Sequence, residues 1–256
     1  MLNSISHLSG AKVSASDGSI GKVNDVFFDD RSWTVRYLVV DTGNWLKGRE
    51  VLISPYSVKQ PVGSQKHIHL ALTRQQVESS PDVDTQQPVS RQHERELLRH
   101  HGYAEYWDGG GLWAMGAMPY PPPMLDTTAE RAANQEMLDR DFRAADSHLR
   151  SAAHVTGYDI QASDDGIGQV QDFVIDDQTW AIRYLVVDTS QWWQGGHKVL
   201  VGMHWADRID WATHKLHVRM TRDQVRSSPA FEDVGSIHRE YEMRLHRNYE
   251  RQGYWL

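Results

Sequence analysis

The chain has 256 residues, of which 39% are hydrophobic and 24% charged, a balance typical of a soluble globular protein. It has no cysteine, which excludes disulfides, thiolate metal ligands and cysteine nucleophiles and favours a reducing, cytoplasmic location. The net charge is −7 and no basic stripe is present, which argues against nucleic acid as a partner.

One module is present twice in the sequence. Residues 2–48 align with residues 149–195, and about half of the positions in the best-matched part are identical. After one inserted residue, the match continues to the end of each copy. Each copy spans about 80 residues, a normal size for a small domain. We therefore predict two tandem domains that superpose closely, repeat 1 (1–81) and repeat 2 (149–229).

Each repeat is predicted to consist of short strands joined by tight turns. In repeat 1 the turns at 16–19 and 29–32 contain the glycine and aspartate residues that such turns favour. The predicted strands are 11–13, 21–28, 33–41, 49–53 and 67–72.

A short helix should close each repeat. Thr73 and Gln76, like Thr221 and Gln224, match a capping box, and a proline follows each predicted helix. Several short strands and a terminal helical turn predict a mainly β fold, with two tandem, small, closed or nearly closed β-barrels.

The predicted strand at 33–41 is apolar on both faces near its end. Strict alternation places Tyr37 and Val39 on one face, and Arg36 with the following apolar residues on the other. A barrel strand with its outer face in water should stay polar there, so another surface should cover this face. We expect the other barrel, another chain or the segment after each repeat to do so, and the candidate interaction residues are Leu38, Val40, Leu185 and Val187.

The segments that follow the two repeats resemble each other. Residues 91–107 and 238–255 are charged, show a helical pattern and end in aromatic residues. Their apolar stripes are formed by Leu97, Leu98 and His101 and by Tyr241, Leu245 and Tyr249. The first segment lies in an acidic connector, 82–148, which has a Gly/Pro/Met-rich stretch at 109–124 and a predicted helix at about 127–145; the second lies in a helical aromatic tail, 230–256.

Candidate catalytic residues do not form a convergent set. The carboxylate pairs at 29–30 and 176–177 lie between two strands, so we interpret them as turn residues rather than as metal ligands. Arg36 and Arg183 could anchor an anionic ligand, but we interpret each as the partner of a nearby aspartate. We therefore predict no catalytic residue, cofactor-binding residue or metal ligand.

Histidines and tryptophans are the other conspicuous side chains. The chain has 14 histidines but no HExxH motif, and the first candidates for a metal would be His67, His69 and His217. Trp45, Trp192 and Trp193 lie in a loop between strands and are candidates for recognition, because exposed tryptophan is enriched at interface hot spots. The alternative is that these tryptophans form a lid over the open end of each barrel.

The residues that the repeats share resemble the PRC-barrel family, which is named after the cytoplasmic domain of the photosynthetic reaction-centre H subunit. The pattern is DG-x-IG-x-V-x-D, DD-x-x-W, RYLVVDT, W-x-x-G, VL and SP. In repeat 1 the matching residues are Gly18, Ile20, Gly21, Val23, Asp25, Asp29, Asp30, Trp33, 36–42, Trp45, Gly48, Val51, Leu52, Ser54 and Pro55. In repeat 2 they are Ile167, Gly168, Val170, Asp172, Asp176, Asp177, Trp180, 183–189, Trp192, Gly195, Val199 and Leu200, with departures at 165–166 and 202–203.

The resemblance implies a barrel that is used for protein contacts rather than for chemistry. We therefore expect a non-enzymatic interaction or assembly scaffold with a protein partner of unknown identity, in which the barrels pair within one chain or in a homo-oligomer. A peripheral assembly factor of a photosynthetic or other membrane complex is the first alternative. The longest apolar runs, such as 37–40, are too short to span a bilayer, so only peripheral membrane association would apply. A ribosome-maturation or RNA-associated factor is the second alternative, which the acidic balance opposes.

Overall fold

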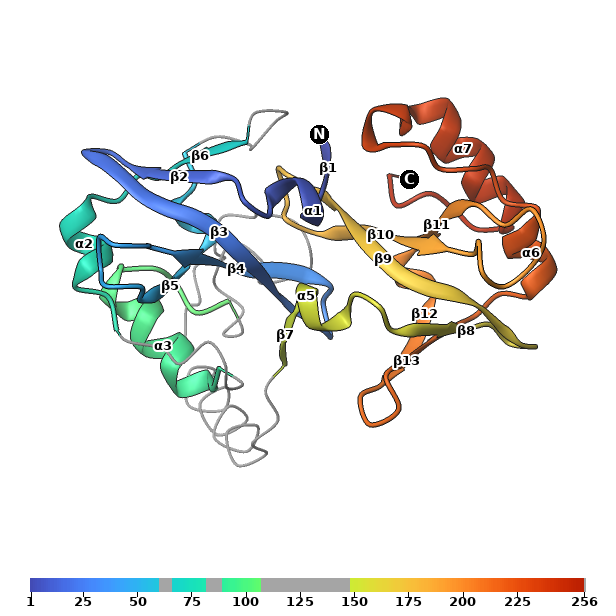
Figure 1. Ribbon diagram of the computed structural model, residues 1–256, viewed down its shortest axis with the longest axis horizontal. Coiled ribbons are helices and arrows are strands. Elements are labelled where there is room, and N and C mark those ends of the chain that lie inside the picture. Colours follow the sequence, from blue (N-terminus) through green and yellow to red (C-terminus); the bar gives the residue numbers. More distant parts are fainter. Residues whose placement is uncertain (60–65, 82–88, 107–147, 256) are drawn as a thin grey trace, which may run out of the picture. The chain divides into compact units, whose positions relative to one another are not determined.

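The computed structural model describes residues 1–59, 66–81, 89–106 and 148–255, which form two compact units (Figure 1). We call them the repeat-1 unit, Ser9–Arg150 with Gln178–Ala181, and the repeat-2 unit, Met1–Leu8 with Ser151–Asp177 and Ile182–Leu256. Strands dominate both units, which confirms the predicted mainly β fold. The expected stretch at 109–124 and helix at 127–145 lie outside the described residues.

The repeat-1 unit is built on a sheet with the strand order β5-β4-β3-β2-β6, and β7 also pairs with β3. Helices α2 and α3 come after β6 in the chain, and α2 begins with the predicted capping box of Thr73 and Gln76. The elements are β2 (Lys12–Ala15), β3 (Gly18–Asp29), β4 (Thr34–Asp41), β5 (Glu50–Ile53), η1 (Pro55–Ser57), β6 (His67–His69), α2 (Arg74–Glu78), α3 (Arg91–His100) and β7 (Leu149–Ser151).

The repeat-2 unit has the strand order β11-β10-β9-β8-β13-β12, and β1 also pairs with β9. Its α6 begins with the second predicted capping box, formed by Thr221 and Gln224. The elements are β1 (Leu2–Ser4), α1 (Ile5–Leu8), α5 (Ala152–Val155), β8 (Asp159–Gln161), β9 (Gly166–Asp176), β10 (Ile182–Asp188), β11 (Lys198–Gly202), η2 (Met203–Trp205), β12 (Ala206–Asp210), β13 (Lys215–Val218), α6 (Arg222–Arg226), η3 (Val234–Ser236) and α7 (Arg239–Asn248).

Neither sheet is a closed barrel in the described residues. In the repeat-2 unit the sheet path runs from β11 to β12, and these end strands are joined by the 3-10 turn η2 rather than by a ladder of hydrogen bonds. The prediction of closed barrels is thus wrong for the described residues, whereas the mainly β class of the fold is confirmed. Neighbouring strands approach each other closely at Gly21, where a Cβ would lie 1.9 Å from the carbonyl oxygen of Asp41. Gly168 makes the same close approach to Asp188 in repeat 2, at 2.3 Å.

A β-bulge lies at the same place in both repeats and redirects an arginine. Phe27 is opposite Tyr37 but Phe28 is opposite Val35, so the register shifts by one residue at Arg36. The pairing of β9 with β10 shifts in the same way at Arg183. A bulge re-aims the side chain at the inserted position. Strict alternation is therefore the wrong rule for Arg36, which does not share the face of Leu38.

The helix after repeat 1 covers a different face of β4 from the one expected. Leu97 of α3 belongs to a buried cluster with Tyr37, Val39 and Leu52, so α3 packs on the face of Tyr37. Helix α3 therefore does not cover Leu38 and Val40, because these two residues lie on the opposite, inner face of β4. The register pairs them with buried aliphatic residues of both neighbouring strands, namely Val26 and Ile53 for Leu38, and Val23 and Val51 for Val40.

The opening strand of each repeat joins the sheet of the other repeat. β1 pairs antiparallel with β9, with Leu2 opposite Asp176 and Ser4 opposite Val174. In return β7 pairs with β3. Every other strand of the two sheets stays with its own repeat. The compact units therefore differ from the repeats at their starts, a feature that three-residue strands without alternation did not indicate in the sequence.

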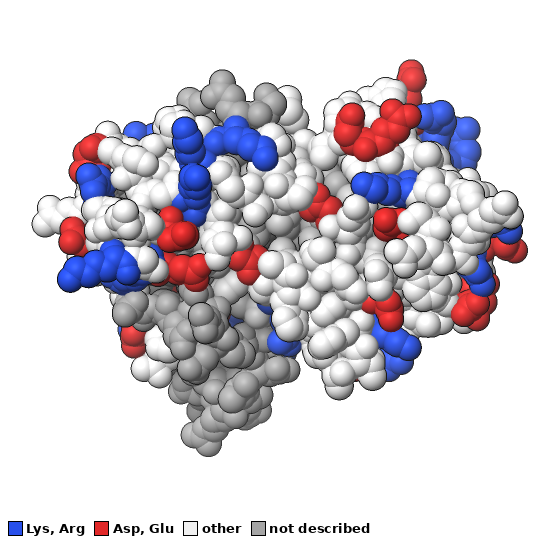
Figure 2. Space-filling view, in the orientation of Figure 1, with Lys and Arg blue, Asp and Glu red and all other residues white. Residues whose placement is uncertain are grey.

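Charged side chains of both signs are spread over the visible face of each unit (Figure 2). No helix among the described residues has the length and apolarity needed to cross a bilayer, and the longest, α3 and α7, have 10 residues each.

Candidate functional site

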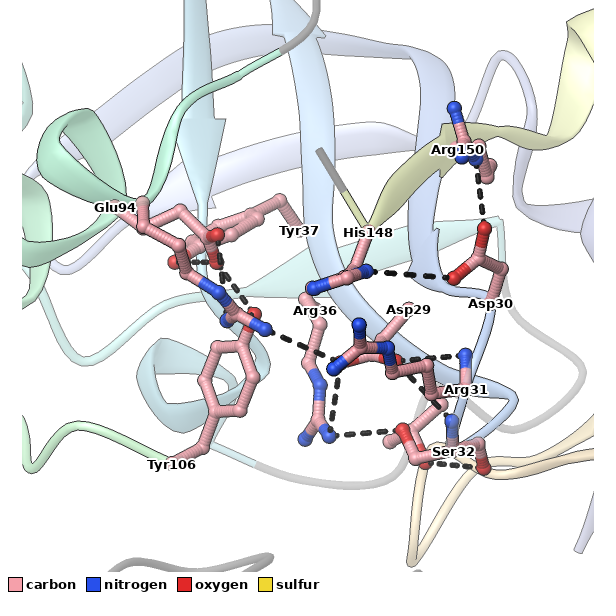
Figure 3. Close-up of polar contacts among 12 residues, drawn as sticks. Asp29, Asp30, Arg31, Ser32, Arg36, Tyr37, Glu94, Tyr106, His148 and Arg150 are labelled. Carbon is pink, nitrogen blue, oxygen red and sulfur yellow. Dashed lines mark hydrogen bonds and ion pairs between the residues drawn. The ribbon is translucent and has the colours of Figure 1, made fainter. Parts of the chain in front are cut away.

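A carboxyl group is buried beneath α3 in the repeat-1 unit. Glu94 is 2% exposed, and its Oε2 accepts hydrogen bonds from the hydroxyls of Tyr106 at 2.5 Å and Tyr37 at 3.3 Å (Figure 3). Arg91 donates to the Tyr106 hydroxyl at 2.6 Å and lies 3.5 Å from the other oxygen of Glu94. The carboxyl group is thus enclosed by two phenols and one guanidinium.

Local structure explains why these groups meet. Ser90 caps α3 by accepting from the His93 amide, and the i,i+3 spacing then places Arg91 and Glu94 on one side of the helix. Beside the bulge in β4, the guanidinium of Arg36 lies 3.9 Å from the ring centroid of Tyr106. Because of the bulge, Arg36 and its neighbour Tyr37 both reach the same cluster.

The burial of this cluster changes its titration. Burial raises the pKa of Glu94 to about 7, although Arg91 and the hydrogen bond from Tyr106 act to lower it. Burial also raises the pKa of Tyr37 and of Tyr106 well above the ordinary value, and the neighbouring Glu94 carboxylate adds to both shifts. Glu94 therefore changes its protonation near neutral pH, whereas the two phenols keep their protons and remain donors.

The paired aspartates at the end of β3 have separate roles (Figure 3). Asp29 accepts from the amides of Arg31 and Ser32 at 2.9 and 3.1 Å, and it lies 3.8 Å from Arg36. This confirms Asp29 as a turn residue and Arg36 as the partner of a nearby aspartate. Arg183 pairs with Asp176 in the same way, at 3.2 Å.

Asp30, in contrast, binds the segment that leads into β7. Its carboxylate accepts from Arg150 at 2.8 Å and lies 3.9 Å from His148, while its amide donates to the His148 carbonyl at 3.0 Å. The interpretation as a turn residue is therefore incomplete for Asp30, because it also fixes a strand that comes from the other repeat.

The repeat-2 unit contains the same cluster at corresponding positions. Glu242 of α7 is 4% exposed, accepts from Tyr184 and Tyr254 at 2.8 Å each, and forms an ion pair with Arg239 at 3.2 Å. Arg183 lies 4.4 Å over the Tyr254 ring. We call these clusters the repeat-1 lock (Arg36, Tyr37, Arg91, Glu94 and Tyr106) and the repeat-2 lock (Arg183, Tyr184, Arg239, Glu242 and Tyr254).

The similarity of the two trailing segments is visible in the sequence, but neither lock is among the predicted sites. The signal was present, because the alignment of the last strands, continued without a gap, matches Arg91 with Arg239, Glu94 with Glu242 and Tyr106 with Tyr254. The expected apolar stripes are confirmed for Leu97, Leu98, Tyr241, Leu245 and Tyr249, which are all buried, whereas His101 is only half-buried. Each lock thus fastens the helix after a repeat onto the sheet of that repeat.

The candidate recognition tryptophans are half-buried. The guanidinium of Arg74, the first residue of α2, lies 4.5 Å over Trp45, and that of Arg222, the first residue of α6, lies 5.5 Å over Trp193. Trp192 packs against Gly166, where a Cβ would lie 2.2 Å from the indole. The candidate interaction residues on the strands are all fully buried, namely Leu38, Val40, Leu185 and Val187.

Metal-binding residues do not gather in the part of the chain that the structure describes, where no group of three His, Cys, Asp or Glu side chains is placed to hold an ion. The rings of His67 and His69 stack at 4.2 Å, and His67 lies 2.8 Å from the Ser14 hydroxyl. His217 lines a depression of about 570 Å³ on the repeat-2 unit. Polar groups there bond to each other, as in the 2.6 Å ion pair of Arg219 with Asp207.

Two small β units, each built on a strand that carries RYLVVD and each completed by a short capped helix, define a tandem of one barrel-type module. The sequence model of the PRC-barrel domain matches residues 2–69 and 150–225, more than half of the chain. The chain belongs to the PRC-barrel family, in two tandem copies. A comparison with curated proteins gives no match.

Proposed function

We propose that this chain is a non-enzymatic protein-interaction scaffold in which each PRC barrel presents a docking surface. The observation that carries the proposal is the duplication of the locks. Both copies keep the same five polar residues, and both bury the carboxyl group, at 2% and 4% exposure. A catalytic group must come within hydrogen-bond reach of its substrate. The burial of the group that both repeats retain supports a role in the folded shape rather than in chemistry.

The tryptophan loops are the docking surfaces that we propose. Each loop is closed at its base by a threonine hydroxyl, since Thr42 donates to the Arg49 carbonyl and Thr189 to the His197 carbonyl, both at 2.6 Å. One tryptophan of each loop lies under the guanidinium of the arginine that begins α2 or α6. Tryptophan and arginine are the residue types most enriched at hot spots, and a rigid aromatic side chain loses little entropy on binding. The expected partner is a protein that inserts apolar side chains against these rings.

The test is affinity purification of the tagged full chain from the cells that produce it, at matched expression of the wild type, Trp45→Ala and Trp193→Ala. Loss of a hot-spot residue costs about 2 kcal/mol or more, so recovery of a partner should fall by about 30-fold. Met243→Ala is the control, because Met243 is another exposed large apolar side chain but lies on α7. It should leave recovery unchanged.

Circular dichroism and thermal unfolding establish that the variants remain folded. Recovery of no stoichiometric protein with the wild-type chain would contradict the scaffold function itself. Equal recovery by the wild type and both tryptophan variants would contradict the assignment of the docking surface to the loops.

A further inference from the structure

The two opening strands are exchanged in a reciprocal way. Residue Asn3 of repeat 1 lies beside the aspartate at the end of β9, with its side-chain amide 3.3 Å from Asp177. The corresponding residue of repeat 2, Arg150, lies beside the aspartate at the end of β3, at 2.8 Å from Asp30. The same backbone bond forms in each case, from the amide of the aspartate to the carbonyl of residue 1 or of His148, at 2.9 and 3.0 Å.

Side chains as well as backbone hold the strand on β9. Asp172 accepts the amide of Ser6 at 3.1 Å and also binds the Ser6 hydroxyl. Asp177 accepts from Asn3. The edge of β9 thus offers a backbone ladder at 174–176 with a carboxylate at each end. It selects a short strand that has a side-chain donor at one position and that continues into a helical turn with a serine three residues later.

Each exchanged segment leaves its partner sheet at a glycine. The amide of Gly10 donates to Val23 and that of Gly157 to Val170, both at 2.8 Å, so from these residues onward the chain is held by its own repeat. Both glycines have a left-handed backbone, with φ of +77° and +93°, and nothing lies within 4 Å of a Cβ at either position. Such a position changes direction with little steric resistance. The segment before it can therefore follow another path without disturbing the repeat.

We propose that the edge of β9 is a strand-addition site, and that its occupant besides residues 2–8 of the same chain is residues 2–8 of a second copy of this chain. Every hydrogen bond at the site is identical whichever copy supplies the segment, so only the covalent connection differs between the two states. A tethered segment acts at an effective concentration of the order of mM, which favours the closed single chain when the protein is dilute. Exchange between copies then increases with protein concentration. This inference is independent of the proposed docking role of the tryptophan loops.

Cysteine cross-linking tests the proposal directly, because the chain has no cysteine of its own. Ser4 and Val174 are opposite each other in the β1–β9 pairing. Opposed antiparallel residues have Cα atoms about 4.5–5.5 Å apart, within the range that a disulfide spans. Full chains carrying Ser4→Cys are mixed with full chains carrying Val174→Cys, unfolded and refolded together over a range of concentrations, and oxidised. We expect a disulfide-linked dimer of the two variants whose fraction rises with concentration.

The control pair combines Ser4→Cys with Gln169→Cys, which is exposed on β9 but lies outside the β1 pairing. The double variant Ser4→Cys/Val174→Cys must also cross-link within one chain at low concentration. A second pair, Asn3→Cys with Ile175→Cys, repeats both measurements in case the first pair fails to fold. Cross-linking within one chain, with mixed chains at the control level at every concentration, would overturn the proposal. So would the absence of both cross-links in folded variants.

Discussion

The two locks hold their helices with the same five residues but have different surroundings, and the first difference is one residue of each helix. Position 98 of α3 is leucine, whereas the corresponding position 246 of α7 is histidine. His246 is buried and lies 3.1 Å from the Tyr184 hydroxyl, so the repeat-2 lock has an additional titratable member. The arginines differ as well, since the Arg91 side chain is 22% exposed and that of Arg239 is 54% exposed. The same fold therefore tolerates two electrostatic designs.

The designs should respond to pH in opposite directions. The folded pKa of Glu94 is raised, so the stability from its neutral form is complete below the unfolded value of 4.5 and is lost as the pH rises to about 7. Burial lowers the pKa of His246, so its contribution is complete above the ordinary value of 6.5 and is lost as the pH falls from there through the lowered pKa of the folded state. We expect α3 to loosen on the alkaline side and α7 on the acidic side.

The largest expected effect is the truncation of a buried leucine, and it should be similar in the two units. Leu97 and Leu245 occupy corresponding positions and are almost fully buried. Leu97→Ala and Leu245→Ala should each lower the free energy of unfolding of their own unit by about 2–5 kcal/mol, because truncation of a buried leucine leaves a cavity. Calorimetry of the full chain measures the loss. Hydrogen exchange of α3 and α7 assigns it to a unit, and each variant serves as the control for the other. A loss below 1 kcal/mol in either would show that its helix does not depend on the sheet.

The pH response of the repeat-1 lock can be isolated with Glu94→Gln, which keeps the shape of the side chain but cannot ionise. A shift in pKa from 4.5 to about 7 corresponds to about 3 kcal/mol. The difference in free energy of unfolding between the wild type and Glu94→Gln should therefore change by about 3 kcal/mol between pH 4 and pH 8, with the wild type losing stability relative to the variant as the pH rises. Denaturant titrations at each pH measure it.

Hydrogen exchange provides the internal control for this prediction. Protection of α3 should carry the pH dependence that the substitution removes, whereas protection of α7 should be the same in both proteins. An unchanged difference between pH 4 and pH 8 would contradict the prediction, because it would mean that the pKa of Glu94 is the same in the folded and unfolded states.

Much of the fold could be predicted from the sequence because its signals are local. Turn-forming residues and alternation predict the main strands, and the capping boxes predict α2 and α6. Each of these signals depends on residues that are only a few positions apart. The covering of β4 could not be predicted in the same way. The bulge at Arg36 is a property of the pairing between two strands, and it invalidates the alternation that assigns faces within one strand.

The exchanged strands and the locks were hidden for a related reason. β1 and β7 have three residues each, too few to show a period, and their partners are more than a hundred residues away. Within the locks, Glu94 and Arg91 look like an ordinary exposed i,i+3 ion pair of a charged helix. Only the tertiary contact with Tyr37 and Tyr106 shows that the carboxyl group is buried. A comparison of the two repeats does give a signal for the locks. Both repeats keep the same arginine and glutamate in the helix and the same tyrosine after it.

The smallest expected effect concerns the residue that distinguishes the two locks. His246→Leu copies the residue of repeat 1 and removes the contact with Tyr184, so it should lower the free energy of unfolding by about 1 kcal/mol at pH 8. As the pH falls through 6.5, the wild type loses stability relative to His246→Leu, because a buried imidazolium is disfavoured, and the neighbouring His204, whose pKa burial also lowers, adds repulsion. The reciprocal variant, Leu98→His, should give α3 an acid sensitivity that it lacks in the wild type. Hydrogen exchange of α3 and α7 between pH 5 and pH 8 measures both. If α7 in the wild type and in His246→Leu responds identically to acid, the lock and not this histidine determines how the repeat-2 unit titrates.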